Sequence, residues 1–292
     1  MRPGAGRAVK RLAGSPEPPT VDAVTAYLDL YQSFDPPYER FDNTLLGAEF
    51  PAELDLVSRL WFRCGYRPGI AAYLNFFLLR DFIRIHDTSF PPRFKSLRSM
   101  ANSFYQTDLF IREVTDSGAR PSGGISNRRV REQLKGIQRR HDRIGIPPWM
   151  QTYFGFSLLE NVEKQCAPLS QEERRLHLAY MARTYRIMGF RFSQSRADLE
   201  RFARLIEKEQ ASLTERVPEH SRHILRIGEM IGVSSAEESV LPMLPAATRA
   251  VFEPLYAKVR PGPALRLWSR FLGRLLLPKA VGEPRRAVPV EG

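Results

Sequence analysis

The sequence VREQLKGIQRRHDRIGIPPWMQTYFGF occupies residues 130–156 and decides the fold. In its first half, apolar residues and His141 recur every three or four positions, which places them on one stripe of a helix. The intervening positions are mostly charged and suit the solvated side of that helix. The sequence GIPP at 145–148 ends it, and an apolar, aromatic helix over 149–163 is expected next. The stripe consists of Val130, Leu134, Ile137, His141 and Ile144.

Helix signals dominate elsewhere too. The strongly apolar segment 70–85 predicts one buried helix, and a turn-rich stretch over 116–127 precedes the His141 helix. Ser170 and Glu173 have the spacing of a capping box, and the helix that they begin is expected to stop at Gly189. Period-two alternation is scarce, so the sequence predicts an all-α fold of about ten helices, built on helix-on-helix packing.

Composition limits the domain organisation. The 292 residues are 43% hydrophobic and 11% aromatic, which is enough for a sizeable core. We expect a single helical domain over 21–280, without an internal linker or repeat. The ends, 1–20 and 281–292, are predicted to be flexible tails; residues 1–20 are rich in Pro, Gly, Arg and Ser.

Cysteine usage fits a cytosolic protein, with a single disulfide as the alternative. The net charge of +12 permits binding to nucleic acid or to an anionic membrane without requiring either. Cys64 and Cys166 lie far apart and indicate neither a metal-binding pair nor a disulfide framework. No apolar run approaches the roughly 20 residues that span a bilayer. The expected location is cytoplasmic, or peripheral to a membrane.

Several familiar active-site motifs are absent from the sequence. It has no Walker A loop, no dinucleotide-binding fingerprint and no nucleophile elbow. His220 and His223 lie one helical turn apart near two glutamates, but three neighbouring arginines oppose a metal site there. His86 is expected at a helix end, where it contacts terminal carbonyls. His177, which follows two arginines, is expected at the surface.

His141 has two interpretations. An imidazole on an apolar stripe with basic residues nearby is suited to be an axial haem ligand. The same pattern is typical of a core histidine whose ring nitrogens find backbone partners. From periodicity alone the second interpretation is the commoner one.

Two alternatives describe a non-catalytic, basic helical protein. The arginine-rich segment 128–143 suggests contacts with phosphates, but it contains acidic residues and lacks the aromatic rings on which bases stack. The segment 265–277 places apolar residues on one side of a helix and arginines on another, which suits docking at a membrane surface or packing as a terminal helix. Nucleic-acid binding is the less favoured of the two.

The segment LKGIQRRHDRIGIPPWMQTYFGF, residues 134–156, resembles the central motif of the haem-dependent oxygenase superfamily of bacterial rubber oxygenase (latex clearing protein) and the fungal MpaB-type oxygenases. The segment 105–118 is similar to the distal block of that family, 169–190 to a later S-x-x-E helix that ends in a Met-Gly step, and 43–54 to the N-terminal block. The order and spacing of the blocks, rather than any single one, carry the resemblance. Ser103 stands where the family commonly has an arginine.

The resemblance implies a fold with globin-like packing around a pocket for haem b. His141 then matches the axial ligand of the iron, with its other ring N–H directed to a carbonyl or carboxylate. Arg140 is a candidate partner for the haem propionates, with Arg139 and Arg143 as alternatives, and Thr107 matches a distal, catalytic hydroxyl. The implied substrates are O2 and an apolar, isoprenoid or lipid-like molecule, which is oxidised or cleaved.

Overall fold

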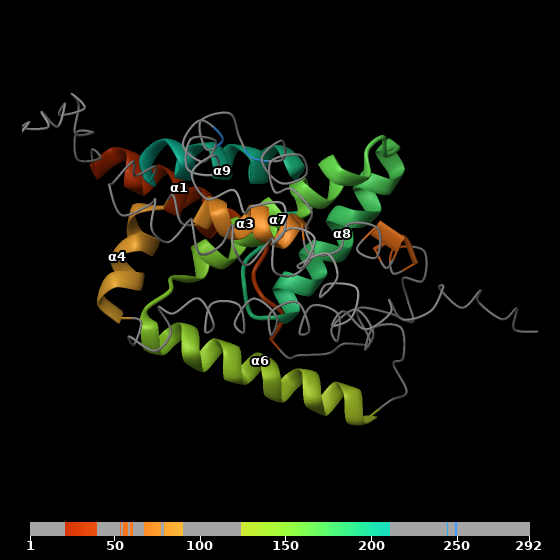
Figure 1. The fold of residues 1–292 in the computed structure, drawn as a ribbon, viewed down its shortest axis with the longest axis horizontal. Coiled ribbons are helices and arrows are strands. Elements are labelled where there is room, and N and C mark those ends of the chain that lie inside the picture. Colours follow the sequence, from red (N-terminus) through yellow and green to blue (C-terminus); the bar gives the residue numbers. More distant parts are fainter. Residues whose placement is uncertain are drawn as a thin grey trace, which may run out of the picture.

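Every regular element that the computed structural model describes is a helix (Figure 1). The described residues are 21–39, parts of 53–60, 67–89 without 77 and 78, 124–210, and the positions 244 and 249. No strand occurs in these ranges, so the predicted all-α class is confirmed. The helices are α1 (Val21–Ser33), α3 (Arg67–Phe76), α4 (Arg80–Ser89), α6 (Gly124–Ile144), α7 (Pro148–Cys166), α8 (Gln171–Ile187) and α9 (Arg196–Gln210).

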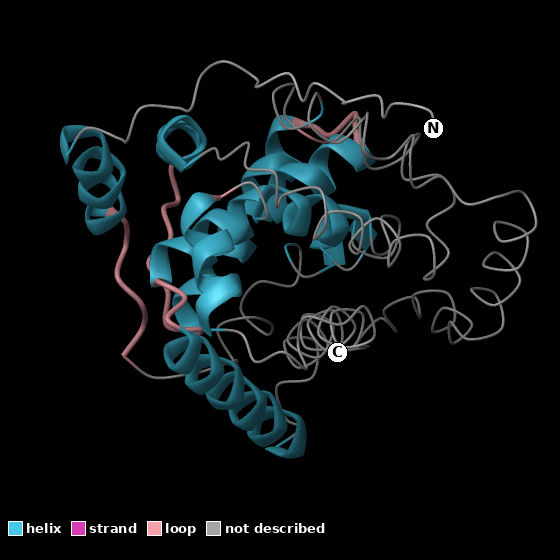
Figure 2. Cartoon of the chain, turned by 60° about the vertical axis from the view of Figure 1, so that its left-hand side comes forward, coloured by secondary structure: helices cyan, strands magenta, loops and turns pink. Residues whose placement is uncertain are grey.

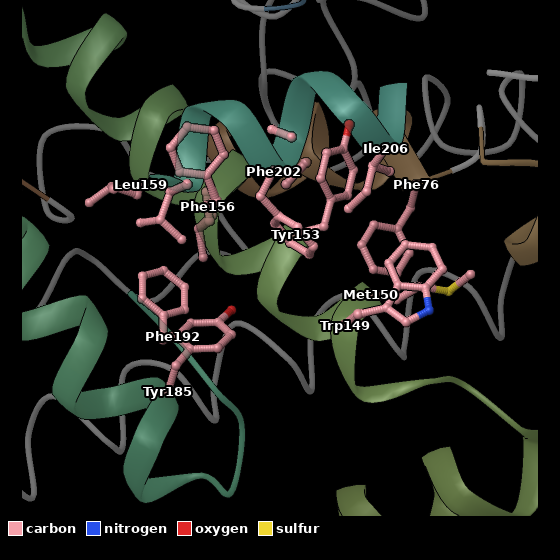
Figure 3. Packing of buried hydrophobic residues seen from close by; sticks show 14 of the residues in the cluster. Phe76, Trp149, Met150, Tyr153, Phe156, Leu159, Tyr185, Phe192, Phe202 and Ile206 are labelled. Carbon is pink, nitrogen blue, oxygen red and sulfur yellow. The ribbon is translucent and has the colours of Figure 1, made fainter. Parts of the chain in front are cut away.

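The centre of the described structure is α7, which is buried along most of its length. Helix α3 packs along it, α8 and α9 also contact it, and α1 packs on α9 (Figure 1). A helix that is apolar on most of its circumference has to be covered by neighbours in this way. Figure 3 shows the resulting core, where aromatic rings from several helices meet; among them are Phe76, Tyr153, Phe156, Tyr185 and Phe202.

Helices α6 and α8 end in the same backbone motif. Each helix is followed by the glycine that was predicted to end it, and both glycines have a positive φ: +77° at Gly145 and +91° at Gly189. In both cases the next N–H donates to the carbonyl five residues before it, over 3.0 Å to His141 and 3.0 Å to Tyr185. These are the bonds of a Schellman motif, whose left-handed residue favours glycine. Both predicted helix ends are therefore confirmed.

The predicted start of α8 is also confirmed, whereas that of α6 lies earlier than expected. The hydroxyl of Ser170 accepts a hydrogen bond from the N–H of Glu173, whose carboxylate accepts one from the N–H of Ser170. This reciprocal capping box satisfies two N–H groups that the helix itself leaves without partners. Helix α6 begins at Gly124, so the last four residues of the predicted turn, 124–127, are helical.

The predicted single helix over 70–85 is wrong, because the chain forms α3 and α4 there. The side chain of Gln210, at the end of α9, is 1% exposed and reaches the start of α4. Its Oε1 accepts from the N–H of Asp81 over 3.3 Å, and its Nε2 donates to Asp81 Oδ2 and to the hydroxyl of Tyr27, both over 3.1 Å. This distant partner satisfies a backbone N–H that a new helix start would otherwise leave without a partner.

Helix α6 lies along one edge of the described structure, apart from α1 and α9 (Figures 1 and 2). Leu134 is 5% exposed and Ile137 packs against the core, so the predicted apolar stripe faces inward. The charged positions between them face solvent, again as predicted; the exposed ones are Glu132, Lys135, Arg139, Arg140, Asp142 and Arg143.

Candidate functional site

His141 lies in the last turn of α6, on the inward stripe that carries Leu134 and Ile137. Its ring is half-buried, and its Nδ1 is fully buried without a hydrogen-bond partner in the described part of the chain. Its backbone carbonyl belongs to the Schellman motif and accepts from Ile146 N–H over 3.0 Å. The motif fixes the backbone of His141 at the end of the helix, one turn before the chain enters α7.

The imidazole of His141 is uncharged at neutral pH. Burial lowers the pKa of His141 to about 4, the positive charge of Arg140 lowers it further, and the carboxylate of Asp142 opposes the shift. Neutral imidazole is the form that binds metal ions, because the ring nitrogen then keeps its lone pair. At neutral pH, a metal ion would therefore not have to displace a proton from this ring nitrogen.

Three exposed arginines surround the position of His141 on α6. Arg140, the candidate propionate partner, directly precedes it and is exposed, as are Arg139 and Arg143. The Nε of Arg139 donates to the carbonyl of Lys135 over 3.2 Å, which folds that side chain back along its own helix. Of the three, Arg140 has an electrostatic effect on His141, and its pairing with a haem propionate stays a prediction.

Other predicted site residues lie outside the described residues. This holds for Thr107, for the pair His220 and His223, and for the apolar segment 265–277.

Among the described residues, no group of three His, Cys, Asp or Glu side chains is placed to hold a metal ion. A haem iron needs only one such ligand from the protein, since the porphyrin supplies the others.

The described residues fit a haem on the side of its axial ligand. Such a ligand must be an uncharged ring nitrogen in surroundings that limit access of water. His141 has this character, and Arg140 offers a positive charge for a propionate. One expectation is not met: if Nε2 holds the iron, the buried Nδ1 lacks the carbonyl or carboxylate acceptor that the resemblance implies, as far as the described residues go.

A buried charge cluster that the sequence did not reveal joins α7, α8 and α9. His177 is 0% exposed, so the prediction that it lies at the surface is wrong. Its Nδ1 lies 3.4 Å from Oε1 of Glu163, a carboxylate that is itself 2% exposed. The other oxygen of Glu163 accepts from Nη1 of Arg196 over 2.7 Å and lies 3.9 Å from Nη1 of Arg174. The two arginines compensate a buried carboxylate, which makes the cluster a tie between three helices.

The partners in this cluster are distant in sequence; Glu163 and Arg196 stand 33 positions apart. The one available signal was a glutamate within the apolar segment 149–163, since a carboxylate is rarely buried without a cationic partner.

A second polar contact crosses the core between α7 and α9. The hydroxyl of Tyr153 donates to the carboxylate of Glu207 over 3.2 Å. Burial raises the pKa of both groups, that of Glu207 above 4.5 and that of Tyr153 well above 10.

His86 is buried too, at 2% exposure, in the last turn of α4, where its Nδ1 lies 3.8 Å from Oδ1 of Asp87. It stands at the predicted helix end.

Comparison of the chain with known protein families, curated proteins and solved structures identified no relative. No family model matches the chain, and neither a curated protein nor a solved structure matches it at a significant level. Within the described ranges, none of the helices has the length and apolar character needed to cross a membrane.

Proposed function

We propose that this protein is a haem-dependent oxygenase that binds haem b through His141. The observation that carries the proposal is the uncharged, half-buried imidazole of His141, which faces inward from the last turn of α6 with a buried nitrogen that has no partner in the described part of the chain. An uncharged ring nitrogen without a hydrogen-bond partner keeps its lone pair available for a metal ion, which supports a ligand role.

In the proposed site, His141 holds the iron and Arg140 pairs with a propionate, while Thr107 supplies the distal hydroxyl that the sequence resemblance implies. Bound haem supplies the activation of O2 for oxidation of an apolar, isoprenoid or lipid-like substrate. The protein orients the cofactor, keeps the imidazole free of a proton and limits the access of water to it.

The test compares the visible spectrum of the haem-supplemented wild type with that of His141→Ala. We expect a Soret band in the wild type that is lost or shifted in the variant. His177→Gln is the matched control, because it removes a histidine that lies buried on another helix and leaves His141 in place. Addition of free imidazole to His141→Ala should restore the wild-type band. Absence of haem from the wild type, or identical spectra of wild type and His141→Ala, would overturn the proposal.

A second candidate function is electrostatic docking on an anionic membrane. The observation that favours it is the outer side of α6, where Lys135, Arg139, Arg140 and Arg143 are all exposed. Basic side chains close to an anionic bilayer contribute about 1 kcal/mol each. Liposomes containing phosphatidylserine should sediment the wild type, and the triple variant Lys135→Gln, Arg139→Gln, Arg143→Gln should remain in solution. Binding to DNA but not to liposomes would replace this candidate with nucleic-acid binding.

A further inference from the structure

Helix α6 is tied to α8 by one directional contact. Nε2 of Gln138 donates a hydrogen bond to the backbone carbonyl of Met188 over 2.6 Å, across 50 positions of sequence. Within the described ranges, it joins a side chain of α6 to the carboxyl-terminal end of α8. Gln138 precedes His141 by three residues, so the two side chains are neighbours on the helix surface.

The end of α8 leaves this carbonyl available. The Schellman bonds at the end of α8 use the carbonyls of Tyr185 and Arg186. Met188 is the next residue but one, and the last carbonyls of a helix have no donor within the helix itself. The negative end of the helix dipole also favours a donor at this position.

Gly189 leaves room for the amide of Gln138. A β-carbon on residue 189 would lie 2.9 Å from Nε2 of Gln138, closer than side-chain carbons are found. The φ angle of +91° favours glycine here as well. The stop signal of α8 and the docking of α6 therefore depend on the same residue.

We infer that Gln138 is the positioning residue that sets the rotation of α6, and with it the direction of the His141 ring toward bound haem. This inference rests on the proposed function. The apolar contacts of Leu134 and Ile137 hold α6 against the core but are not directional, so they tolerate small rotations and shifts along the helix axis. The hydrogen bond of Gln138 is directional and restricts both movements. It acts on the ligand through the helix that both residues share.

The experiment uses the full chain with Gln138→Met, which keeps the length of the side chain and removes the donor, and Gln138→Glu, which also adds a negative charge. Lys135→Gln is the control for that charge: it lowers the net charge of the same helix by one unit on its exposed side. Gln138→Lys is the rescue variant, because its ammonium group retains a donor of similar reach.

Two readouts are needed. The first is the haem dissociation constant, together with the visible and electron paramagnetic resonance spectra of the ferric protein, which report the axial ligand. We expect about a tenfold weaker affinity and an altered axial signature in Gln138→Met and Gln138→Glu. Lys135→Gln should match the wild type, and Gln138→Lys should recover at least part of the affinity. The second readout is amide hydrogen exchange of the apoprotein, where residues 137–146 should exchange faster in the Met and Glu variants.

The outcomes separate the two proposals. Haem uptake by the wild type with unchanged affinity and spectra in Gln138→Met overturns the positioning role and leaves the haem proposal intact. Faster exchange with unchanged spectra also overturns it, because Gln138 then stabilises α6 without directing His141. Absence of haem from the wild type overturns the proposed function, and the positioning role with it.

Discussion

Gly155 of α7 lies directly against the ring of Tyr185 on α8. A β-carbon at residue 155 would lie 2.6 Å from each Cε atom of that ring and closer still to Cζ. The ring has little room to withdraw, because it packs against Phe192, at 4.9 Å between ring centroids, and against Phe190, at 6.1 Å. Figure 3 shows Tyr185 and Phe192 side by side in the core. We therefore expect Gly155→Ala to destabilise the protein.

The magnitude follows from two opposed effects. Alanine in a helix interior is about 1 kcal/mol more favourable than glycine. Carbon atoms attract one another best at about 3.5–4.0 Å, so the new contact is strongly repulsive. Forcing an extra carbon into a packed core costs about 1–3 kcal/mol, and occasionally more. With the cost at the upper end, Gly155→Ala should lower the free energy of unfolding by about 2 kcal/mol.

Gly136, in the interior of α6, is a matched control. It has no atom within 4 Å of the position of a β-carbon, so Gly136→Ala keeps the gain in helix propensity without the clash. The free energy of unfolding should rise by about 1 kcal/mol, which separates the two alanine variants by roughly 3 kcal/mol. Urea denaturation followed by circular dichroism measures both against the wild type.

A third variant identifies the cause. Tyr185→Ala removes the ring, and in that background Gly155→Ala should lose the cost of the clash and keep the gain in helix propensity, which gives a coupling free energy of about 3 kcal/mol. Equal stabilisation by both alanine variants, or an unchanged cost of Gly155→Ala without the Tyr185 ring, would refute this account of the core.

Three further predictions concern polar contacts that hold the helices in place. Burial raises the pKa of Glu207, so the folded state resists its ionisation, and this contribution to stability is lost as pH rises above about 4.5 through the folded pKa. Glu207→Gln keeps an acceptor for Tyr153 and should weaken the dependence of the free energy of unfolding on pH. Urea denaturation at several pH values measures this dependence; the same dependence in wild type and variant would contradict a raised pKa of Glu207. Arg196→Gln leaves the buried carboxylate of Glu163 without its closest donor and should lower the free energy of unfolding by about 3 kcal/mol, whereas a loss no larger than that of a surface substitution would argue against the cluster. Ser170→Ala removes the cap of α8 and should cost about 1 kcal/mol, measured in the same way, with no loss expected if Glu173 alone caps the helix.

Local patterns were sufficient for most of the described helices and for several of their ends. The stop at Gly189 and the capping box of Ser170 and Glu173 depend on residues within one turn of each other, so the sequence displays them directly. The inward stripe of α6 depends on helical periodicity alone and is seen in the same register in the structure. For the candidate site, the sequence indicated an inward-facing His141 beside Arg140, but not that the Nδ1 of His141 is fully buried.

What only the tertiary structure decided are contacts between residues distant in the chain. Gln210, from 129 positions away, accepts a hydrogen bond at the start of α4 within the segment 70–85, and Arg196 compensates the buried carboxylate of Glu163. His177 looked like a surface residue because its sequence neighbours are basic, yet it is buried against Glu163 of α7. Such effects arise when helices pack, because a buried polar group takes its partner from whichever segment lies beside it. The sequence determined the helices and their apolar faces, and packing determined which polar side chains meet between them.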